Sequence, residues 1–126
     1  MLNKNSDVIC LLDDDPSVLK AVSRLLSSAG WHVEQFSDPE KFLEYAKIHR
    51  PPVAVIDIWM PLMNGLEVQS RLRELSPSTR VIIFTGKDDL MVRSTALNAG
   101  ASAFLTKPFD DEELLTAIRL ALAAAT

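Results

Sequence analysis

The stretch VAVIDIWMP, residues Val53–Pro61, places one carboxylate at the end of an apolar run. The run Val53–Asp57 is nearly continuous in hydrophobic residues, which is typical of a strand buried on both faces of a parallel sheet. An acid is costly to bury, so Asp57 at the end of such a strand calls for a chemical explanation. Met60 and Pro61 then turn the chain away from the end of the strand.

Four further runs of apolar or β-branched residues predict strands: Asp7–Leu12, His32–Phe36, Arg80–Thr85 and Ala103–Thr106. Helical periodicity separates the five runs, with a clear apolar stripe from Val18 to Ala29 and a stop at Gly30. Asp15-Pro16 and Asp38-Pro39 each match an N-cap followed by proline at the first helical position.

The later helices are predicted around Val68–Leu75, over Asp88–Asn98 with a thin apolar stripe, and around Leu114–Leu122. Strand and helix therefore alternate five times. This alternation predicts an α/β domain with a doubly wound parallel sheet covered by helices on both faces. We expect residues 1–126 to form this single (βα)5 domain.

The composition indicates the cellular compartment of the protein and the classes of partner that it contacts. The single cysteine, Cys10, lies inside the apolar run VICLL, which excludes an internal disulfide and predicts a small core residue. We expect a cytoplasmic protein, because no stretch resembles a signal peptide or a membrane span. The net charge of −4 argues against bulk nucleic-acid binding, so we expect no direct nucleic-acid or membrane contact.

Polar residues gather where the predicted strands end. Asp13, Asp14 and Asp15 follow the first strand, Asp57 ends the third, Thr85 ends the fourth and Lys107 follows the fifth. In open parallel sheets, ligands bind outside the carboxyl ends of the strands. We therefore expect these side chains to form one site.

The chemistry of these residues points to phosphoryl transfer. Clustered carboxylates repel one another, and a divalent cation with a preference for oxygen ligands, Mg²⁺ or Mn²⁺, relieves that repulsion. Lys107 supplies a positive charge for an anion, and Thr85 a hydroxyl that donates to a phosphoryl oxygen. A carboxylate nucleophile with these partners fits phosphorylation of an aspartate.

Four motifs resemble the receiver domains of two-component response regulators: LLDDDPS, VIDIWMPLMNGLE, IIFTGKDD and AFLTKPF. The similarity covers nearly the whole chain and is greatest to receivers of FixJ/NarL-type transcriptional regulators, within the CheY-like superfamily. It implies a flavodoxin-like three-layer sandwich with strand order 2-1-3-4-5.

The resemblance also implies roles for the acidic residues. Asp57 aligns with the phospho-accepting aspartate, Asp14 with the carboxylate that ligates the metal directly, and Asp13 with one that acts mainly through water. The backbone carbonyl of Trp59 aligns with the third protein ligand. Lys107 aligns with the phosphate-binding lysine, in a Lys107-Pro108 peptide bond that is usually cis in the family.

Thr85 and Phe104 align with the switch hydroxyl and the switch aromatic of the family. Phe104 has no hydroxyl, so an inward rotation of its ring would be a packing event. Trp59 and Lys87 flank the phosphate position and are expected to tune access of water. We hypothesise that the bulk of Trp59 slows hydrolysis of the aspartyl phosphate.

The implied function is a phosphorylation switch rather than a conventional metabolic enzyme. Its phosphodonor partner would be a sensor histidine kinase. Phosphorylation would change the surface of the fourth helix, fifth strand and fifth helix, where relatives often form homodimers, and so control an output domain or downstream protein, with transcription as the expected output.

Two alternatives remain open at this point. A haloacid-dehalogenase-like phosphohydrolase also uses an aspartate nucleophile and Mg²⁺, and Asp13-x-Asp15 matches its signature, but it leaves Asp57 without a role. The second alternative is a binding module that works without phosphorylation. The residue that takes up phosphate distinguishes the two enzyme-like interpretations: Asp13 in the hydrolase, Asp57 in the receiver.

Overall fold

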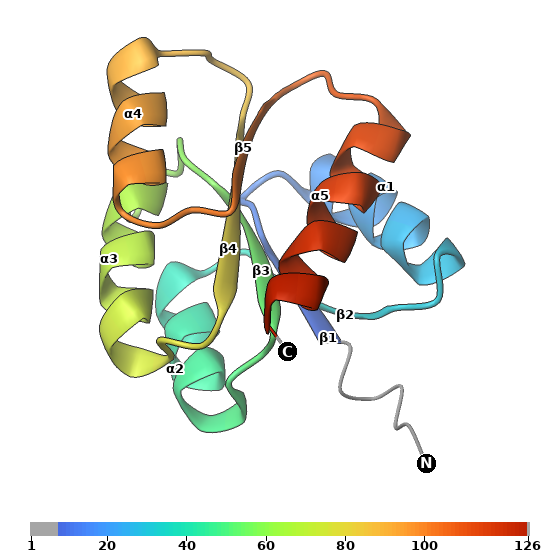
Figure 1. Ribbon diagram of the computed structural model, residues 1–126, viewed down its shortest axis with the longest axis horizontal. Coiled ribbons are helices and arrows are strands. Elements are labelled where there is room, and N and C mark those ends of the chain that lie inside the picture. The colour runs from blue at the N-terminus through green and yellow to red at the C-terminus, as the bar shows by residue number, and fades with distance from the viewer. Residues whose placement is uncertain (1–7, 126) are drawn as a thin grey trace.

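Strand and helix alternate through residues 8–125, the part of the chain that the computed structural model describes. The five strands in this part are β1 (Val8–Leu12), β2 (His32–Phe36), β3 (Val53–Asp57), β4 (Arg80–Thr85) and β5 (Ala103–Thr106). The five helices are α1 (Pro16–Ser28), α2 (Pro39–His49), α3 (Gly65–Leu75), α4 (Leu90–Asn98) and α5 (Asp111–Ala125), as drawn in Figure 1.

The strands form one parallel sheet in the order β2-β1-β3-β4-β5. This confirms the expected doubly wound arrangement. Val55 in the centre of β3 pairs with Leu11 on one side and with Ile82 on the other. All five residues of β3 are buried, so Asp57 stands at the end of the best-enclosed strand.

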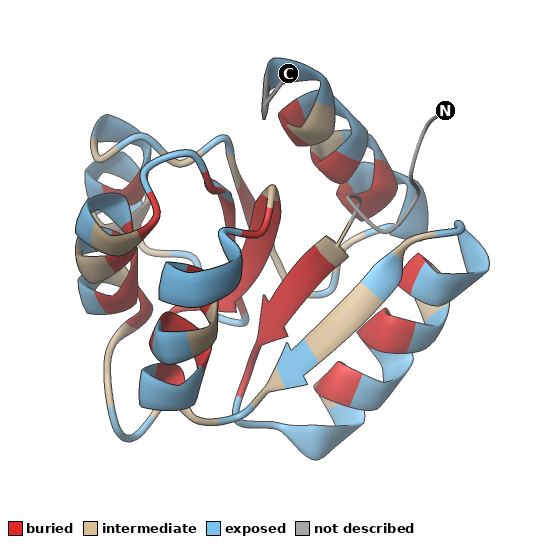
Figure 2. Cartoon of the chain, turned by 90° about the horizontal axis from the view of Figure 1, so that it is seen from below, coloured by how far each residue is buried: buried red, intermediate tan, exposed pale blue. Residues whose placement is uncertain are grey.

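Alternating residues of β3 face two separate cores. Val53 and Val55 pack with side chains of α1 and α5, whereas Ala54 and Ile56 pack with side chains of α2, α3 and α4. Figure 1 shows these two helical layers on opposite faces of the sheet. Figure 2 shows the buried residues concentrated along the strands other than β2, which has no buried residue, and on the helix sides that face the sheet.

The predicted element boundaries are largely confirmed. Asp15 and Asp38 cap α1 and α2 by accepting hydrogen bonds from the backbone N–H groups of Ser17 at 2.8 Å and Glu40 at 2.9 Å. The predicted first strand began at Asp7, which lies outside the described residues. The prediction of a helix over Asp88–Asn98 was wrong at its start, because Asp89 caps α4 and the helix begins at Leu90.

Cys10 is fully buried, as predicted. Burial, assisted by the nearby Glu34 carboxylate, raises the pKa of its thiol to about 12. The thiol therefore stays protonated and behaves as a small apolar group. Among the helices of the described residues, none is both long and apolar enough to cross a membrane.

Candidate functional site

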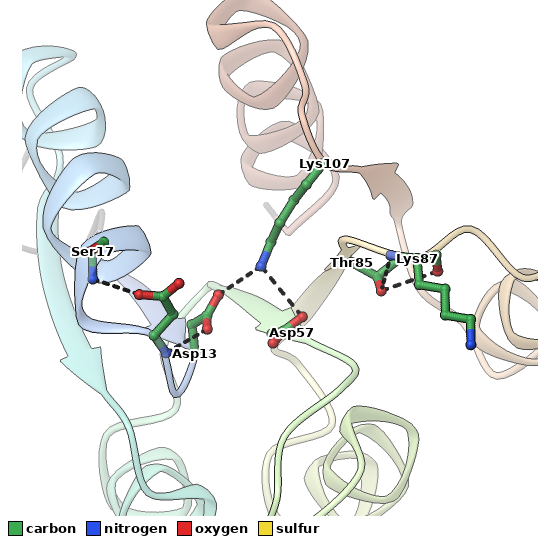
Figure 3. Close-up of polar contacts among 7 residues, drawn as sticks. Asp13, Ser17, Asp57, Thr85, Lys87 and Lys107 are labelled. Carbon is green, nitrogen blue, oxygen red and sulfur yellow. Dashed lines mark hydrogen bonds and ion pairs between the residues drawn. The ribbon is translucent and has the colours of Figure 1, made fainter.

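The carboxyl ends of β1, β3 and β5 bring Asp13, Asp57 and Lys107 together (Figure 3). The Lys107 ammonium lies 3.0 Å from the Oδ2 atom of Asp13 and 3.7 Å from the Oδ1 atom of Asp57. The lysine therefore reaches between two carboxylates that are 1% and 5% exposed, and its shorter contact is with Asp13. The predicted convergence of these strand ends is present in the structure.

Burial dominates the electrostatics of Asp57. The pKa of the carboxyl is raised from 3.8 to about 6, chiefly by burial and in smaller part by the neighbouring carboxylates of Asp13 and Asp14. The charge of Lys107 and a hydrogen bond donated by the backbone N–H of Trp59 act in the opposite direction. Asp57 is thus mostly ionised at neutral pH but poorly solvated, which suits a nucleophile and a cation ligand.

Three carboxylates have the spacing expected of a metal site. Asp13, Asp14 and Asp57 each offer one oxygen, and these oxygens all lie within 4.8 Å of one another. Asp14 is exposed, so the group opens to solvent on one side. An all-oxygen ligand set with room for water matches the preference of Mg²⁺, and the residues present therefore fit the cation that the sequence predicts.

Asp13 and Asp15, in the loop after β1, have different roles. The Oδ1 atom of Asp13 accepts a hydrogen bond from the backbone N–H of Asp15 at 2.9 Å, which holds the Asp13 side chain toward Lys107. The Asp15 carboxylate caps α1 through Ser17. This capping role accounts for Asp15 without the paired catalytic function that the hydrolase alternative requires.

The Lys107 ammonium lies over the ring of Phe84, 4.5 Å from the ring centroid, in a cation–π contact. The Lys107-Pro108 peptide bond is cis, as the family resemblance implied. The lysine side chain is 25% exposed, so its charge remains accessible from the cleft lined by Asp57, Trp59 and Lys87.

Thr85 lies at the neighbouring strand end, but its hydroxyl is bonded to the backbone of Lys87. The hydroxyl accepts from the Lys87 N–H at 3.2 Å and donates to the Lys87 carbonyl at 3.3 Å, and Figure 3 shows this pair beside Asp57. The Lys87 ammonium lies 5.9 Å from the centroid of the half-exposed Trp59 ring. These two residues stand together at the mouth of the cleft.

Phe104 occupies an inward position. Its ring is 7% exposed and packs in the core with Ile83 and Ala96, while the guanidinium carbon of Arg93 lies 4.9 Å from the ring centroid. The sequence interpretation expected an inward rotation, whereas the described state already has the ring inside. Arg93 was missed, because nothing in the thin stripe of the fourth helix marks one arginine as an aromatic partner.

Gly65 is a further residue whose role the sequence did not reveal. A Cβ atom at this position would lie 2.4 Å from the backbone oxygen of Asp57 and 2.8 Å from the Cα of Ile58. The start of α3 therefore packs directly on the backbone of Asp57, which only glycine permits. The motif MNGLE contains this glycine, but the close approach is visible only in three dimensions.

Comparison with known proteins identifies the family. A family model described as the response regulator receiver domain matches residues 9–119. The chain belongs to this receiver domain family. It is 42% identical over 124 residues to the response regulator protein TodT of Pseudomonas putida, a match that covers 98% of this chain and 55% of that protein. The chain thus spans about half the length of the curated relatives it matches.

Solved receiver structures agree with this assignment. The CheY-like response regulator receiver domain protein from Methanospirillum hungatei superposes with a TM-score of 0.89 at 29% identity, covering 94% of this chain and 95% of that one. The beryllofluoride-activated NtrC4 receiver domain dimer gives a TM-score of 0.90 at 29% identity, covering 95% and 99%. The predicted family and two-component signalling function are confirmed, and the phosphohydrolase alternative is set aside.

Proposed function

We propose that Asp57 is the phosphoacceptor of this receiver domain and that a sensor histidine kinase is its phosphodonor. A carboxylate oxygen of Asp57 attacks the phosphorus of the phosphohistidine, the P–N bond breaks, and the imidazole nitrogen leaves with the electron pair. The observation that carries this proposal is the buried Asp57 carboxylate 3.7 Å from the Lys107 ammonium and within one oxygen cluster with Asp13 and Asp14.

Four groups are proposed to hold Mg²⁺ or Mn²⁺: the carboxylates of Asp13, Asp14 and Asp57 and the backbone carbonyl of Trp59. In this arrangement Asp14 would bind the cation directly and Asp13 mainly through water, as the family resemblance implies. When bound, the cation supplies charge neutralisation for the carboxylates and for the transferring phosphoryl group. Lys107, which reaches between Asp13 and Asp57, adds a positive charge that positions the phosphoryl oxygens.

Thr85 and Phe104 are proposed to convert phosphorylation into a change of surface. To donate to a phosphoryl oxygen, the Thr85 hydroxyl must give up the hydrogen bond of 3.3 Å that it donates to the Lys87 carbonyl. The loop that leads into α4 then loses one of the hydrogen bonds that hold it to Thr85. The Phe104 ring keeps its place in the core. The affected surface comprises α4, β5 and α5.

Trp59 and Lys87 are proposed to tune the lifetime of the phosphate. Their side chains meet at the mouth of the cleft, where they limit the approach of a hydrolytic water to Asp57. We expect the Trp59→Asn variant to lose its phosphoryl group faster than the wild type. A half-life that is equal or longer in the variant contradicts this role, and Trp31→Asn controls for the loss of an indole at a residue outside the cleft.

The domain is proposed to serve as the receiver unit, residues 1–126, of a cytoplasmic regulator whose output is transcription. It would catalyse its own phosphorylation and dephosphorylation rather than act as a metabolic enzyme. The NtrC4 receiver was solved as a beryllofluoride-activated dimer, which supports a phosphorylation-dependent homodimer here. The interface proposed for it comprises α4, β5 and α5. Nucleic-acid contact would then belong to an output domain or a downstream protein.

The deciding experiment uses radiolabelled acetyl phosphate and Mg²⁺. We expect one acyl phosphate at Asp57, located by borohydride trapping and mass spectrometry, and none in Asp57→Asn. Label at Asp13 would restore the hydrolase interpretation. Failure of both acetyl phosphate and beryllofluoride to perturb the fluorescence of Trp59, in a Trp31→Phe background, would favour the phosphorylation-independent binding module.

A further inference from the structure

Helix α4 buries little of its apolar surface. Of its nine described residues, Ala96 is the buried one, whereas Leu90 and Met91 are 80% and 78% exposed. Figure 1 shows α4 beside α3 at the β5 side of the sheet. A helix with so little buried apolar surface moves at small cost, so single polar contacts weigh heavily in its position.

One such contact comes from a buried glutamine on α3. Gln69 is 1% exposed, and its Nε2 group donates a hydrogen bond of 3.0 Å to the backbone oxygen of Ala96. The same oxygen accepts from the backbone N–H of Ala101 at 3.0 Å, in the turn that leads to β5. Gln69 thus joins α3 to the carboxyl-terminal end of α4 at the only buried residue of that described helix.

The same helix α3 also contacts the phosphoacceptor. Gly65, one helical turn before Gln69, packs against the backbone oxygen of Asp57, and its N–H donates to the carbonyl of Ile58 at 2.9 Å. Residues four apart lie on the same side of a helix. Gly65 and Gln69 therefore lie on the same side of α3, the first against the backbone of Asp57 and the second bonded to the backbone of α4.

The other half of the Gln69 amide is not satisfied. Within the described residues, its Oε1 atom is buried and has no hydrogen-bond partner. A buried acceptor without a donor destabilises the arrangement that contains it. A shift of α4 that brings a hydrogen-bond donor to Oε1 would remove this cost.

We propose that Gln69 is a positioning residue that sets the resting place of α4 and thereby the ease with which phosphorylation rearranges the α4–β5–α5 surface. The inference rests on the proposed function, since it concerns the response to phosphorylation of Asp57. The Nε2–Ala96 hydrogen bond favours the resting position. Its removal destabilises the resting position relative to the shifted one, without touching the groups that bind phosphate.

The test compares Gln69→Met, which keeps the length and volume of the side chain but removes the amide, with Gln35→Met at the chain's other glutamine, an exposed position. Hydrogen exchange is measured by mass spectrometry without ligand. We expect the amides of residues 90–98 to exchange about two- to tenfold faster in Gln69→Met, the range set by one neutral hydrogen bond, and the central strands to remain unchanged. Gln35→Met should match the wild type.

The second measurement is a beryllofluoride titration in the presence of Mg²⁺, followed by exchange of α4. Gln69→Met should respond at about two- to tenfold lower beryllofluoride than the wild type. An unchanged midpoint with unchanged exchange of α4 overturns the inference, as does a loss of protection across the whole sheet, which would mark a purely structural residue. A wild type that binds no beryllofluoride refutes the proposed function instead.

Discussion

Strand β3 and helix α4 belong to the same domain but are held in opposite ways. All five residues of β3 are buried, and the strand pairs with β1 and β4 along both edges. The nine described residues of α4 bury one side chain, and the helix is further held by the hydrogen bond from Gln69 and by the contact of Arg93 with the Phe104 ring.

This difference matches the two tasks of a receiver. Phosphoryl transfer needs a carboxylate held at fixed distances from its partners, and a fully enclosed strand provides that. A change of surface needs an element with two accessible positions, and a weakly buried helix provides that. The following predictions test the contrast, in order of decreasing effect.

The largest loss of stability is expected from a cavity at Ile56, the residue before Asp57 in β3. Ile56→Ala in β3 removes a fully buried side chain and should lower the free energy of unfolding by about 3–4 kcal/mol. Met91→Ala in α4, at a side chain that is 78% exposed, should change it by less than about 0.5 kcal/mol. Urea denaturation measures both, and a similar cost at the two positions would remove the contrast.

The next effect concerns the charge of Asp57. Its pKa is raised in the folded state, so the bound proton contributes stability that is fully present below pH 3.8 and lost as the pH rises through about 6. In EDTA at pH 7, Asp57→Asn should therefore be more stable than the wild type by up to about 3 kcal/mol, because the pKa of Asp57 rises from 3.8 to about 6 on folding. The gap should close near pH 4.

The control for this pH dependence is Glu74→Gln, which removes a negative charge from an exposed position of α3. It should leave the stability profile almost unchanged. An Asp57→Asn variant that is less stable than the wild type at pH 7 in EDTA would contradict the unfavourable burial of the carboxylate. Added Mg²⁺ should stabilise the wild type and narrow the gap, because a bound cation compensates the ionised group.

A third test addresses the contact between α3 and the backbone of Asp57. Gly65→Ala forces a Cβ atom to within 2.4 Å of the Asp57 oxygen and should destabilise the domain by about 2 kcal/mol, despite the better helix propensity of alanine. Gly86→Ala adds a Cβ atom to open space and should be nearly neutral. Equal thermal midpoints for the two variants would show that α3 can withdraw from β3 without cost.

The smallest effect is expected at the edge of α4. Arg93→Ala removes the guanidinium from the Phe104 ring, a contact expected to contribute about 0.5–1 kcal/mol at a partly exposed site. Arg73→Ala on the exposed side of α3 is the matched control. If chemical denaturation gives the two variants the same stability, the ring is held by the core alone.

Much of the architecture was predictable because its signals are local. The continuous apolar runs predicted the strands, and the Asp-Pro pairs placed the starts of α1 and α2. The start of α4 was misplaced because two adjacent aspartates, Asp88 and Asp89, are both plausible caps, and only the backbone geometry selects the second.

The site was predictable to the extent that strand ends converge in any parallel sheet. Asp13, Asp14, Asp57 and Lys107 come together as expected. The hydrogen bonds of the Thr85 hydroxyl and the inward ring of Phe104 were not predictable, because a rotamer is chosen by the neighbours that pack around it.

The sequence by itself determined the order of elements, the residue types at each strand end and the family of the domain, since periodicity, capping and motif spacing are properties of adjacent residues. Only the tertiary structure decided that Lys107 lies closer to Asp13 than to Asp57, that Gly65 packs on the Asp57 backbone, and that Gln69 reaches Ala96. These contacts join segments far apart in the chain. They depend on atomic positions that are set to within a fraction of an ångström, and these positions are fixed only when the sheet and its two helical layers pack together.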